Sequence, residues 1–515
     1  MNTGKIKLSH FSVKEYLLST CVEEYFSIDE ESSHLKISEL SISYLLQFDD
    51  DFLPLTEAML DSMPLARYAA EHWIDHVKSG RVTPTILQLL LSLFTSESSP
   101  LVNWIRMYDI DGVFRGYQNL SMDRAEACSA LYYSSLIGIQ ELSAGLLHGG
   151  ENANAKGGRL GNPLQASSCE GYESIVKLLL EKGARVNTEG GHFGYALQAA
   201  SFKGNEAVAK LLLKKGAEVN TDGGHYGSAL QAASYVGNEV MAKLLLKSGA
   251  KVNVMGGLYG NALQAASYED NVEIVKLLLE NGGNVNAKGG SYGTALQAAS
   301  YKGNEMVVKL LLEKRADVNA EGGCFKNALQ AASFLGNEVV VKLLLENEAR
   351  VNAEGGPYGN ALQAASYQGK EAIVKMLLER GAEVNQVNVG GWFVSALQAA
   401  SYKGDEAIVK LLLKRGAWVN AEGGYYGNAL QAASFKGNEA VVKLLLEKGA
   451  ELNAKGGHFG NALLAAIYKG NEAIVKILLE KGAEVNAERD QLENALQAAL
   501  VERNEVIVNL LLESI

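Results

Sequence analysis

The stretch G-N-A-L-Q-A-A-S-F-K-G-N-E-A-V-V-K-L-L-L-E-K-G-A-E-L-N-A-K-G-G-H-F occupies residues 427–459 and recurs, with small changes, along most of the chain. Its A-L-Q-A-A-S phrase returns every 33 residues, apart from one step of 35 residues. The leucine of the phrase, in complete or edited copies, is found at Leu131, Leu164, Leu197, Leu230, Leu263, Leu296, Leu329, Leu362, Leu397, Leu430, Leu463 and Leu496. A fixed period of this length predicts a solenoid, in which each unit buries its apolar face against its neighbours.

One unit predicts two helices and a loop. Asn428 stands where a helix begins and can accept a hydrogen bond from an orphan backbone N–H. A short alanine-rich helix follows over 429–435, and a second helix over 439–448 carries apolar residues at helical spacing. Gly449 supplies the left-handed residue that ends a helix at little cost. The remaining Gly-rich segment indicates a hairpin-like connection to the next unit. Because each unit consists of two helices and a loop, the predicted fold class is all-α.

Departures from the consensus mark irregular places in the array. Tyr195 occupies the capping position that is Asn, Ser or Thr in the other copies from Leu197 onward. Arg315 and Glu348 stand where the helix-ending glycine belongs, which costs on the order of 1 kcal/mol each and predicts a softer zone over 310–355. A two-residue insertion lies in 386–395, and an insertion in a repeat maps to a loop.

Residues 470–487, G-N-E-A-I-V-K-I-L-L-E-K-G-A-E-V-N-A, resemble the ankyrin repeat. The usual T-P-L-H opening is replaced by N-A-L-Q, which keeps a polar cap and a polar helix residue in the same places. The resemblance covers residues 125–515, as about 12 repeats of which the first is divergent. It implies a helix-turn-helix plus hairpin in each repeat.

Residues 1–124 have no repeat period and are expected to form a helical, winged-helix-like cap. Helices are predicted over 8–19, 35–46 and 65–77. Together with V-N-W-I-R-M-Y-D at 102–109, these segments resemble the spacer before the ankyrin array in fungal NACHT–ankyrin NOD-like receptor proteins. That family carries a nucleotide-binding NACHT module, but this chain has no G-x-x-x-x-G-K-[ST] phosphate loop. The resemblance is therefore to the sensor half alone, and no cofactor is expected.

Composition excludes several functions. The net charge is −12, and residues 1–124 hold 10 Lys and Arg against 18 Asp and Glu, so nucleic-acid binding has no electrostatic support. The apolar stretch at 86–94 is far too short to span a membrane. Four irregularly spaced cysteines indicate reduced thiols in a cytoplasmic protein, with the nucleus as the alternative.

The sequence offers no catalytic or metal site. His72 and His76 lie four apart on an expected helix, but no third ligand stands at metal spacing, which favours an ordinary amphipathic helix. His192, His225 and His458 share one repeat position, so a solenoid spreads them apart instead of converging them on a substrate. Two stripes of aromatic residues, after Gly-Gly and at the end of the first helix, are interpreted as packing between repeats. We therefore expect no enzyme and no small-molecule substrate.

Partner contacts are expected where residues vary on a fixed frame. The position after Gly-Gly, here called the tip slot, varies from copy to copy at the expected hairpin tip. The position after the aromatic residue of the first helix, here called the helix-one slot, varies too. The candidate residues are Arg159, His192, His225, Leu258, Ser291, Trp392, Tyr425 and His458 in the tip slot, and Lys203, Lys302, Lys403 and Lys436 in the helix-one slot.

These features predict a protein–protein interaction module that acts through the concave face of the array, as a scaffold or a ligand-sensing arm. The receptor resemblance implies a role in fungal self/non-self or stress signalling. Two alternatives stay open. One is a fixed structural adaptor, and the other is the sensor part of a regulatory NTPase whose nucleotide-binding module is absent from this chain.

Overall fold

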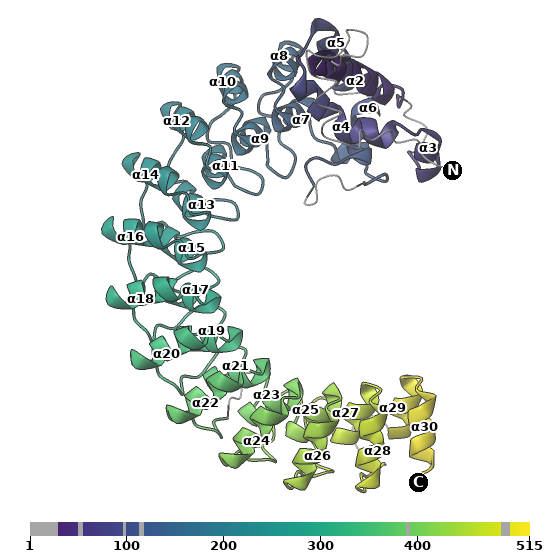
Figure 1. Ribbon diagram of the computed structural model, residues 1–515, viewed down its shortest axis with the longest axis vertical. Coiled ribbons are helices and arrows are strands. Elements are labelled where there is room, and N and C mark those ends of the chain that lie inside the picture. The colour runs from purple at the N-terminus through teal and green to yellow at the C-terminus, as the bar shows by residue number, and fades with distance from the viewer. Residues whose placement is uncertain are drawn as a thin grey trace, which may run out of the picture. The chain divides into compact units, whose positions relative to one another are not determined.

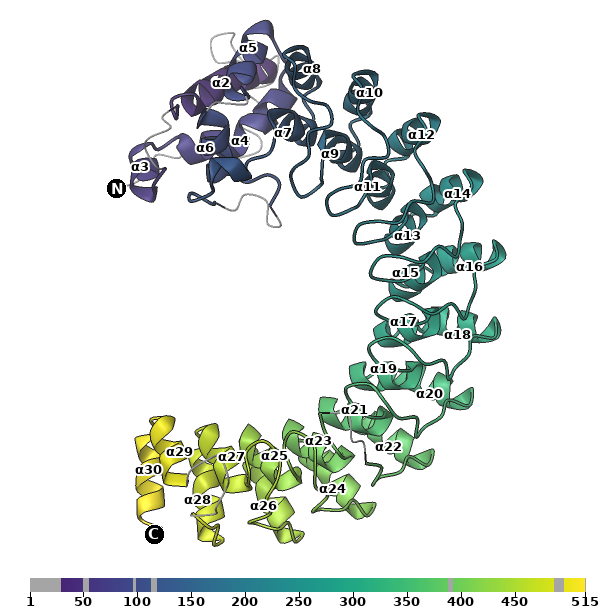
Figure 2. The same ribbon diagram turned by 180° about the vertical axis from the view of Figure 1, so that it is seen from behind.

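The computed structural model describes residues 29–49, 55–95, 99–112, 118–387, 392–485 and 495–514. In these residues α-helices follow one another in short pairs joined by loops (Figures 1 and 2). Pairing between extended segments is limited, in this part of the chain, to isolated bridges. The predicted all-α solenoid is confirmed. The chain divides into two compact units, Met1–His225 and Tyr226–Ile515, which are described separately.

The first unit combines the non-repetitive region with the first repeats. Its described helices are α2 (Glu30–Leu45), α3 (Glu57–Ser62), α4 (Ala66–Ser79), α5 (Pro84–Leu93), α6 (Ser99–Met107), the 3-10 turn η1 (Arg124–Glu126), α7 (Ala130–Ile137), α8 (Gln140–His148), α9 (Pro163–Glu170), α10 (Glu173–Glu181), α11 (Ala196–Lys203) and α12 (Glu206–Lys214).

The helices predicted over 35–46 and 65–77 correspond to α2 and α4, which pack on each other. α2 begins earlier than expected because the Asp29 side chain accepts the Ser32 N–H and caps the helix. The helix predicted over 8–19 lies outside the described residues. An aromatic core joins α4, α5 and α6, where Trp73 and Trp104 pack edge to face with ring centroids 5.3 Å apart. The Trp104 indole N–H donates to the Ala70 carbonyl at 2.9 Å.

Buried hydrogen bonds connect the non-repetitive region to the first repeats. Asp111 accepts the Tyr132 hydroxyl at 2.7 Å and the Arg159 backbone N–H at 2.6 Å. The Tyr132 oxygen in turn accepts the Leu160 N–H at 3.1 Å. These bonds lie inside one compact unit that spans both regions. The predicted domain boundary between residues 124 and 125 therefore rests on the sequence period alone and stays a prediction.

The second unit is a regular stack of helix pairs. Its described helices are α13 (Ala229–Tyr235), α14 (Glu239–Lys247), α15 (Ala262–Tyr268), α16 (Val272–Glu280), α17 (Ala295–Lys302), α18 (Glu305–Glu313), α19 (Ala328–Leu335), α20 (Glu338–Glu346), α21 (Ala361–Gln368), α22 (Glu371–Glu379), α23 (Ala396–Lys403), α24 (Glu406–Lys414), α25 (Ala429–Lys436), α26 (Glu439–Glu447), α27 (Ala462–Tyr468), α28 (Glu472–Glu480), α29 (Ala495–Val501) and α30 (Glu505–Leu512). Each odd-numbered helix packs on the next odd-numbered one, and the even-numbered helices lie behind them (Figure 1).

The predicted caps are confirmed at the described helix starts. Asn428 accepts the Gln431 N–H at 2.9 Å, and the Gln431 side chain returns a bond to the Asn428 N–H, which forms a capping box. Equivalent side-chain caps begin the helices at Ser228, Asn261, Thr294, Asn327, Asn360, Ser395 and Asn461. Tyr195 makes no such bond, as expected.

Helix ends follow the predicted glycine rule and its exceptions. Gly449 has φ of 85° after α26. Arg315 and Glu348 adopt φ of 63° and 65° in the equivalent places, which confirms that non-glycine residues hold the left-handed conformation there. Lys326 does the same at φ of 69° in a hairpin loop, where most copies have glycine. Asp270 and Arg503 have φ of 59° and 55° where other first helices are followed by glycine, and these positions, like Lys326, were not predicted from the sequence.

Polar side chains join successive repeats through their backbones. Asn253 in a hairpin donates to the Gly282 carbonyl at 3.0 Å and accepts the Asn284 N–H at 2.8 Å. Before a second helix, Asn304 donates at 2.8 Å to the Ser267 carbonyl at the end of the preceding first helix. These bonds recur at equivalent positions. Backbone N–H and C=O groups that have no partner within their own loop are therefore hydrogen-bonded by the neighbouring repeat.

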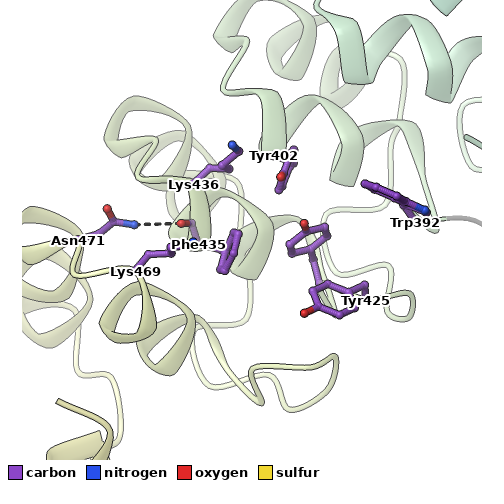
Figure 3. A pocket seen from close by; sticks show the side chains of 8 residues that line it. Trp392, Tyr402, Tyr425, Phe435, Lys436, Lys469 and Asn471 are labelled. Carbon is purple, nitrogen blue, oxygen red and sulfur yellow. Dashed lines mark hydrogen bonds between the residues drawn. The ribbon is translucent and has the colours of Figure 1, made fainter. Parts of the chain in front are cut away.

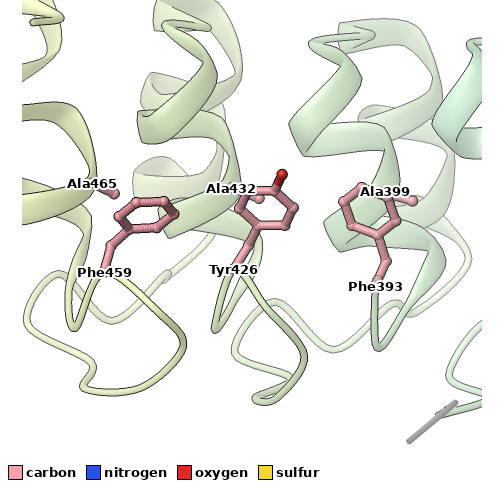
Figure 4. Close-up of a cluster of buried hydrophobic side chains, with 6 residues drawn as sticks. All are labelled: Phe393, Ala399, Tyr426, Ala432, Phe459 and Ala465. Atoms are coloured by element: carbon pink, nitrogen blue, oxygen red, sulfur yellow. The ribbon is translucent and has the colours of Figure 1, made fainter. Parts of the chain in front are cut away.

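The aromatic stripes pack the repeats together, as the sequence analysis interpreted them. Phe393, Tyr426 and Phe459 are buried and lie side by side, each against an alanine of a first helix (Figure 4). The rings of Phe393 and Tyr426 are stacked with centroids 5.5 Å apart. The small alanines let the first helices approach closely, and the rings fill the space between the helices and the loops. In the described residues no helix combines the length and apolarity needed to cross a membrane.

Candidate functional site

The tip-slot residues lie along a backbone ladder. In the first unit the N–H of His192 donates to the Arg159 carbonyl at 2.8 Å, and the N–H of His225 donates to the His192 carbonyl at 2.9 Å. In the second unit Ser291 bonds to Leu258 at 2.9 Å and His458 bonds to Tyr425 at 2.8 Å in the same way. The ladder fixes the backbone of the tips, so differences between repeats are expressed in the side chains that the tips display.

Side chains at the tips of the first unit already have partners. The His192 and His225 rings are stacked with centroids 5.1 Å apart. The pKa of His192 lies below the ordinary histidine value, first because the ring is partly buried and then because His225 and Arg159 are close. The Arg159 guanidinium donates to the Asp111 carbonyl at 3.0 Å, which ties this candidate to the non-repetitive region.

The tips of the second unit display larger exposed surfaces. The Trp392 side chain is 55% exposed, and the backbone N–H of Trp392 donates to the Pro357 carbonyl at 3.1 Å. Tyr425 is 50% exposed and stacks on the His458 ring at 4.8 Å between centroids. Leu258 is partly exposed, and Ser291 is half-buried. Exposed aromatic side chains on a fixed backbone are the residue type that dominates protein interfaces.

The lysines of the helix-one slot differ in their surroundings. Lys302 and Lys436 place their ammonium groups over the Tyr268 and Tyr402 rings of the preceding repeats, 4.5 and 4.7 Å from the centroids. Lys302 also lies 3.7 Å from the Glu269 carboxylate, which is the helix-one residue of the preceding repeat. Lys203 and Lys403 are exposed.

Trp392, Tyr402, Tyr425 and Lys436 are brought together around one pocket in the second unit. Tyr426, Phe435, Lys469 and Asn471 complete its lining (Figure 3). The pocket has a volume of about 730 Å³. It therefore joins residues of both slots into one surface, which the sequence does not predict because the slots lie in different segments of each repeat.

Trp418 is an exposed residue that the sequence analysis missed. Its side chain is 62% exposed. The position two residues after the left-handed residue that follows each second helix is charged or Asn in nine other copies, namely Arg185, Glu218, Lys251, Asn284, Asp317, Arg350, Glu383, Glu451 and Glu484. The comparison of equivalent positions that singled out Trp392 would have found Trp418 as well.

A histidine cluster lies between α2 and α4. The Nδ1 atoms of His34 and His76 are 2.8 Å apart, and the Tyr68 hydroxyl is 2.8 Å from His76 Nε2. His72, the other half of the pair considered from the sequence, places its ring 4.8 Å from that of Tyr68. In the described part of the chain no three His, Cys, Asp or Glu side chains are arranged to hold a metal ion.

Comparison with known families decides the family of this chain. A model of ankyrin repeats, in three copies, matches residues 132–223, 229–322, 321–388 and 390–456, and a model of the single ankyrin repeat matches residues 461–490. The chain belongs to the ankyrin repeat family. As an ankyrin repeat array it is a protein-interaction module, and arrays of this type are typically non-enzymatic.

Two similar proteins give further context for the ankyrin array. The azaphilone pigments biosynthesis cluster protein L of Monascus ruber is 34% identical over 170 residues. The match covers 30% of this chain and 36% of that protein, so the chain spans about a third of its relative's length. The human ASB11 ankyrin repeat domain is a similar solved structure, with 27% identity, 43% of this chain and 97% of that chain covered, and a TM-score of 0.38.

Proposed function

We propose that this ankyrin array recognises a partner protein through its tip slots and helix-one slots, as a scaffold or a ligand-sensing arm. The observation that carries the proposal is a variable set of side chains on a backbone ladder that recurs at most of the tips. Trp392, Tyr425 and His458 show what the ladder displays in the second unit. This is how a rigid scaffold changes specificity while its fold stays constant.

The pathway is a finer part of the same proposal. The spacer motifs at 65–77 and 102–109 support a role in signalling of the fungal NOD-like receptor type. The irregular cysteine spacing supports a cytoplasmic location, with the nucleus as the alternative. A fixed adaptor is the competing function, and it predicts a single tight partner and no tolerance for a changed repeat number. A regulatory NTPase would require a phosphate loop in a neighbouring reading frame.

The test is an affinity capture from native extract with two matched variants. In the tip variant His192, His225, Trp392, Tyr425 and His458 are all changed to Ala. In the control variant five exposed second-helix lysines are changed to Ala, namely Lys210, Lys243, Lys276, Lys309 and Lys410. We expect a partner that the parent chain and the control variant capture and the tip variant loses. Equal capture by all three proteins, each folded by circular dichroism, would contradict the proposal.

A further inference from the structure

The pocket of the second unit is an aromatic surface with a positive edge. Tyr402, Tyr426 and Phe435 come from the stacked aromatic stripes, and Trp392 and Tyr425 extend it to the tips (Figure 3). Burial, and then the hydrogen bond to Tyr402, raises the pKa of Tyr426, so this phenol stays neutral at physiological pH. The charge of the pocket lining therefore comes from Lys436 and Lys469.

Within the described part of the chain these two ammonium groups have no carboxylate partner. Lys436 lies over the Tyr402 ring and Lys469 lies over the Phe435 ring, 4.7 and 4.8 Å from the centroids. Among the described residues neither forms a salt bridge, because the helix-one slot of each preceding repeat also holds a lysine, Lys403 before Lys436 and Lys436 before Lys469. Lys302 makes the same ring contact, but Glu269 in the preceding repeat neutralises it. Two lysines from adjacent repeats without a carboxylate partner therefore line the pocket, in a chain whose net charge is −12.

The spacing of the lysines selects the shape of a complementary anion. Lys436 ends α25 and Lys469 follows α27, and these helices pack directly on each other. Packed helices lie about 8–10 Å apart, so equivalent residues on them have roughly that separation. In an extended polyproline-II segment, residues three apart face the same side and are separated by about 9 Å. A segment with carboxylates three residues apart thus presents one to each lysine.

The other end of the pocket accepts an aromatic side chain. The Trp392 side chain lines the pocket and is 55% exposed, and among the described residues it contacts no other aromatic ring. Tyr425 is held in place by its stacking on His458 and its edge contact with Tyr426. A pre-positioned ring next to an open one can clamp a planar group with little loss of conformational freedom.

We infer that this pocket binds an extended acidic segment of a partner protein, with two carboxylates three residues apart on Lys436 and Lys469 and an aromatic side chain between Trp392 and Tyr425. The inference rests on the proposed recognition function and names the chemistry of its partner. It also gives a reason for three successive lysines in one slot, because their mutual repulsion is relieved when the acidic segment binds.

The experiment measures fluorescence anisotropy of short fluorescein-labelled peptides with the intact chain. The probe carries two glutamates three residues apart and one tyrosine. Matched peptides replace the glutamates with glutamine, place them adjacent to each other, or replace the tyrosine with alanine. We expect the probe to bind most tightly, and its affinity to fall as salt is added. Lys436→Gln with Lys469→Gln should weaken it about tenfold, since each exposed ion pair contributes a few-fold.

Two control variants make the result specific. Lys309→Gln removes an exposed lysine of a second helix, outside both slots and the pocket, and should leave the affinity unchanged, whereas Trp392→Ala should weaken the tyrosine peptide more than the alanine peptide. The inference would be overturned if the glutamate and glutamine peptides bound equally well or if no peptide bound. It would also be overturned if the control lysine variant lost as much affinity for the probe as the variant that lacks Lys436 and Lys469. Tighter binding of a single-stranded oligonucleotide than of the probe would overturn it too. A partner still captured through the tips in those cases would leave the proposed function standing.

Discussion

At the scale of single residues, His76 links the stability of the first unit to pH. Its pKa lies below the ordinary histidine value, first because the ring is partly buried, and then because His34 and His72 are close, with Asp75 opposing the shift. The short contact between the Nδ1 atoms of His34 and His76 needs at least one neutral ring. The folded state therefore binds fewer protons than the unfolded chain, and this part of the stability is present above about pH 6.5 and lost below it.

We predict that the first unit becomes less stable as pH falls from about 7 to about 5, and that His76→Asn reduces this pH dependence. The measurement is thermal unfolding followed by the fluorescence of Trp73 and Trp104, which are both buried in the first unit. His148→Asn, at an exposed position on α8, serves as the control. If the stability of the His76→Asn variant falls with pH as steeply as that of the parent chain, the histidine cluster does not change its protonation on unfolding.

The cap residues show how far local chemistry predicts structure. Asn428 and the left-handed conformation of Arg315 could be read from the sequence, because caps and helix ends depend on neighbouring residues in the chain. The cluster of His34 with His76 could not, since it depends on the packing of two helices without a repeat period. The pocket was not predicted: Trp392 and Lys436 were named as partner-contact candidates in two separate slots, and their meeting at one pocket depends on three-dimensional packing.

At the scale of elements, the glutamine that replaces histidine in the N-A-L-Q opening connects the first helix to the next hairpin in the repeats that carry it. Gln297 donates to the carbonyls of Ala320, Gly322 and Lys326 at 3.0, 3.2 and 2.9 Å, and accepts the Thr294 N–H at 2.7 Å. One buried amide thus closes a capping box and also donates hydrogen bonds to backbone carbonyls in a loop of the following repeat. The sequence placed a polar residue here, but its partners lie more than twenty residues away.

We predict that Gln297→Ala destabilises the second unit by about 1–3 kcal/mol, because buried carbonyls lose their donor. Ser300→Ala on the same helix is the matched control, since the buried Ser300 hydroxyl has no hydrogen-bond partner and its removal should change stability little. Urea unfolding monitored by circular dichroism compares the two variants. Equal midpoints for both would mean that the glutamine contributes no more than the serine.

At the scale of the whole molecule, stability in a solenoid is a sum over repeats and their interfaces, so weak repeats set where it opens. Arg315, Lys326 and Glu348 hold the left-handed conformation within about one repeat length of each other.

We predict faster amide hydrogen exchange over 310–355 than in the repeats on either side. Arg315→Gly with Glu348→Gly should slow exchange there by roughly fivefold or more, since each left-handed non-glycine residue costs on the order of 1 kcal/mol. Hydrogen exchange with mass spectrometry locates the effect by peptide, and Gly449→Ala should create a new soft region at the end of α26. Uniform exchange along the parent array would refute the prediction, because it would show that packing between repeats overrides the local backbone strain.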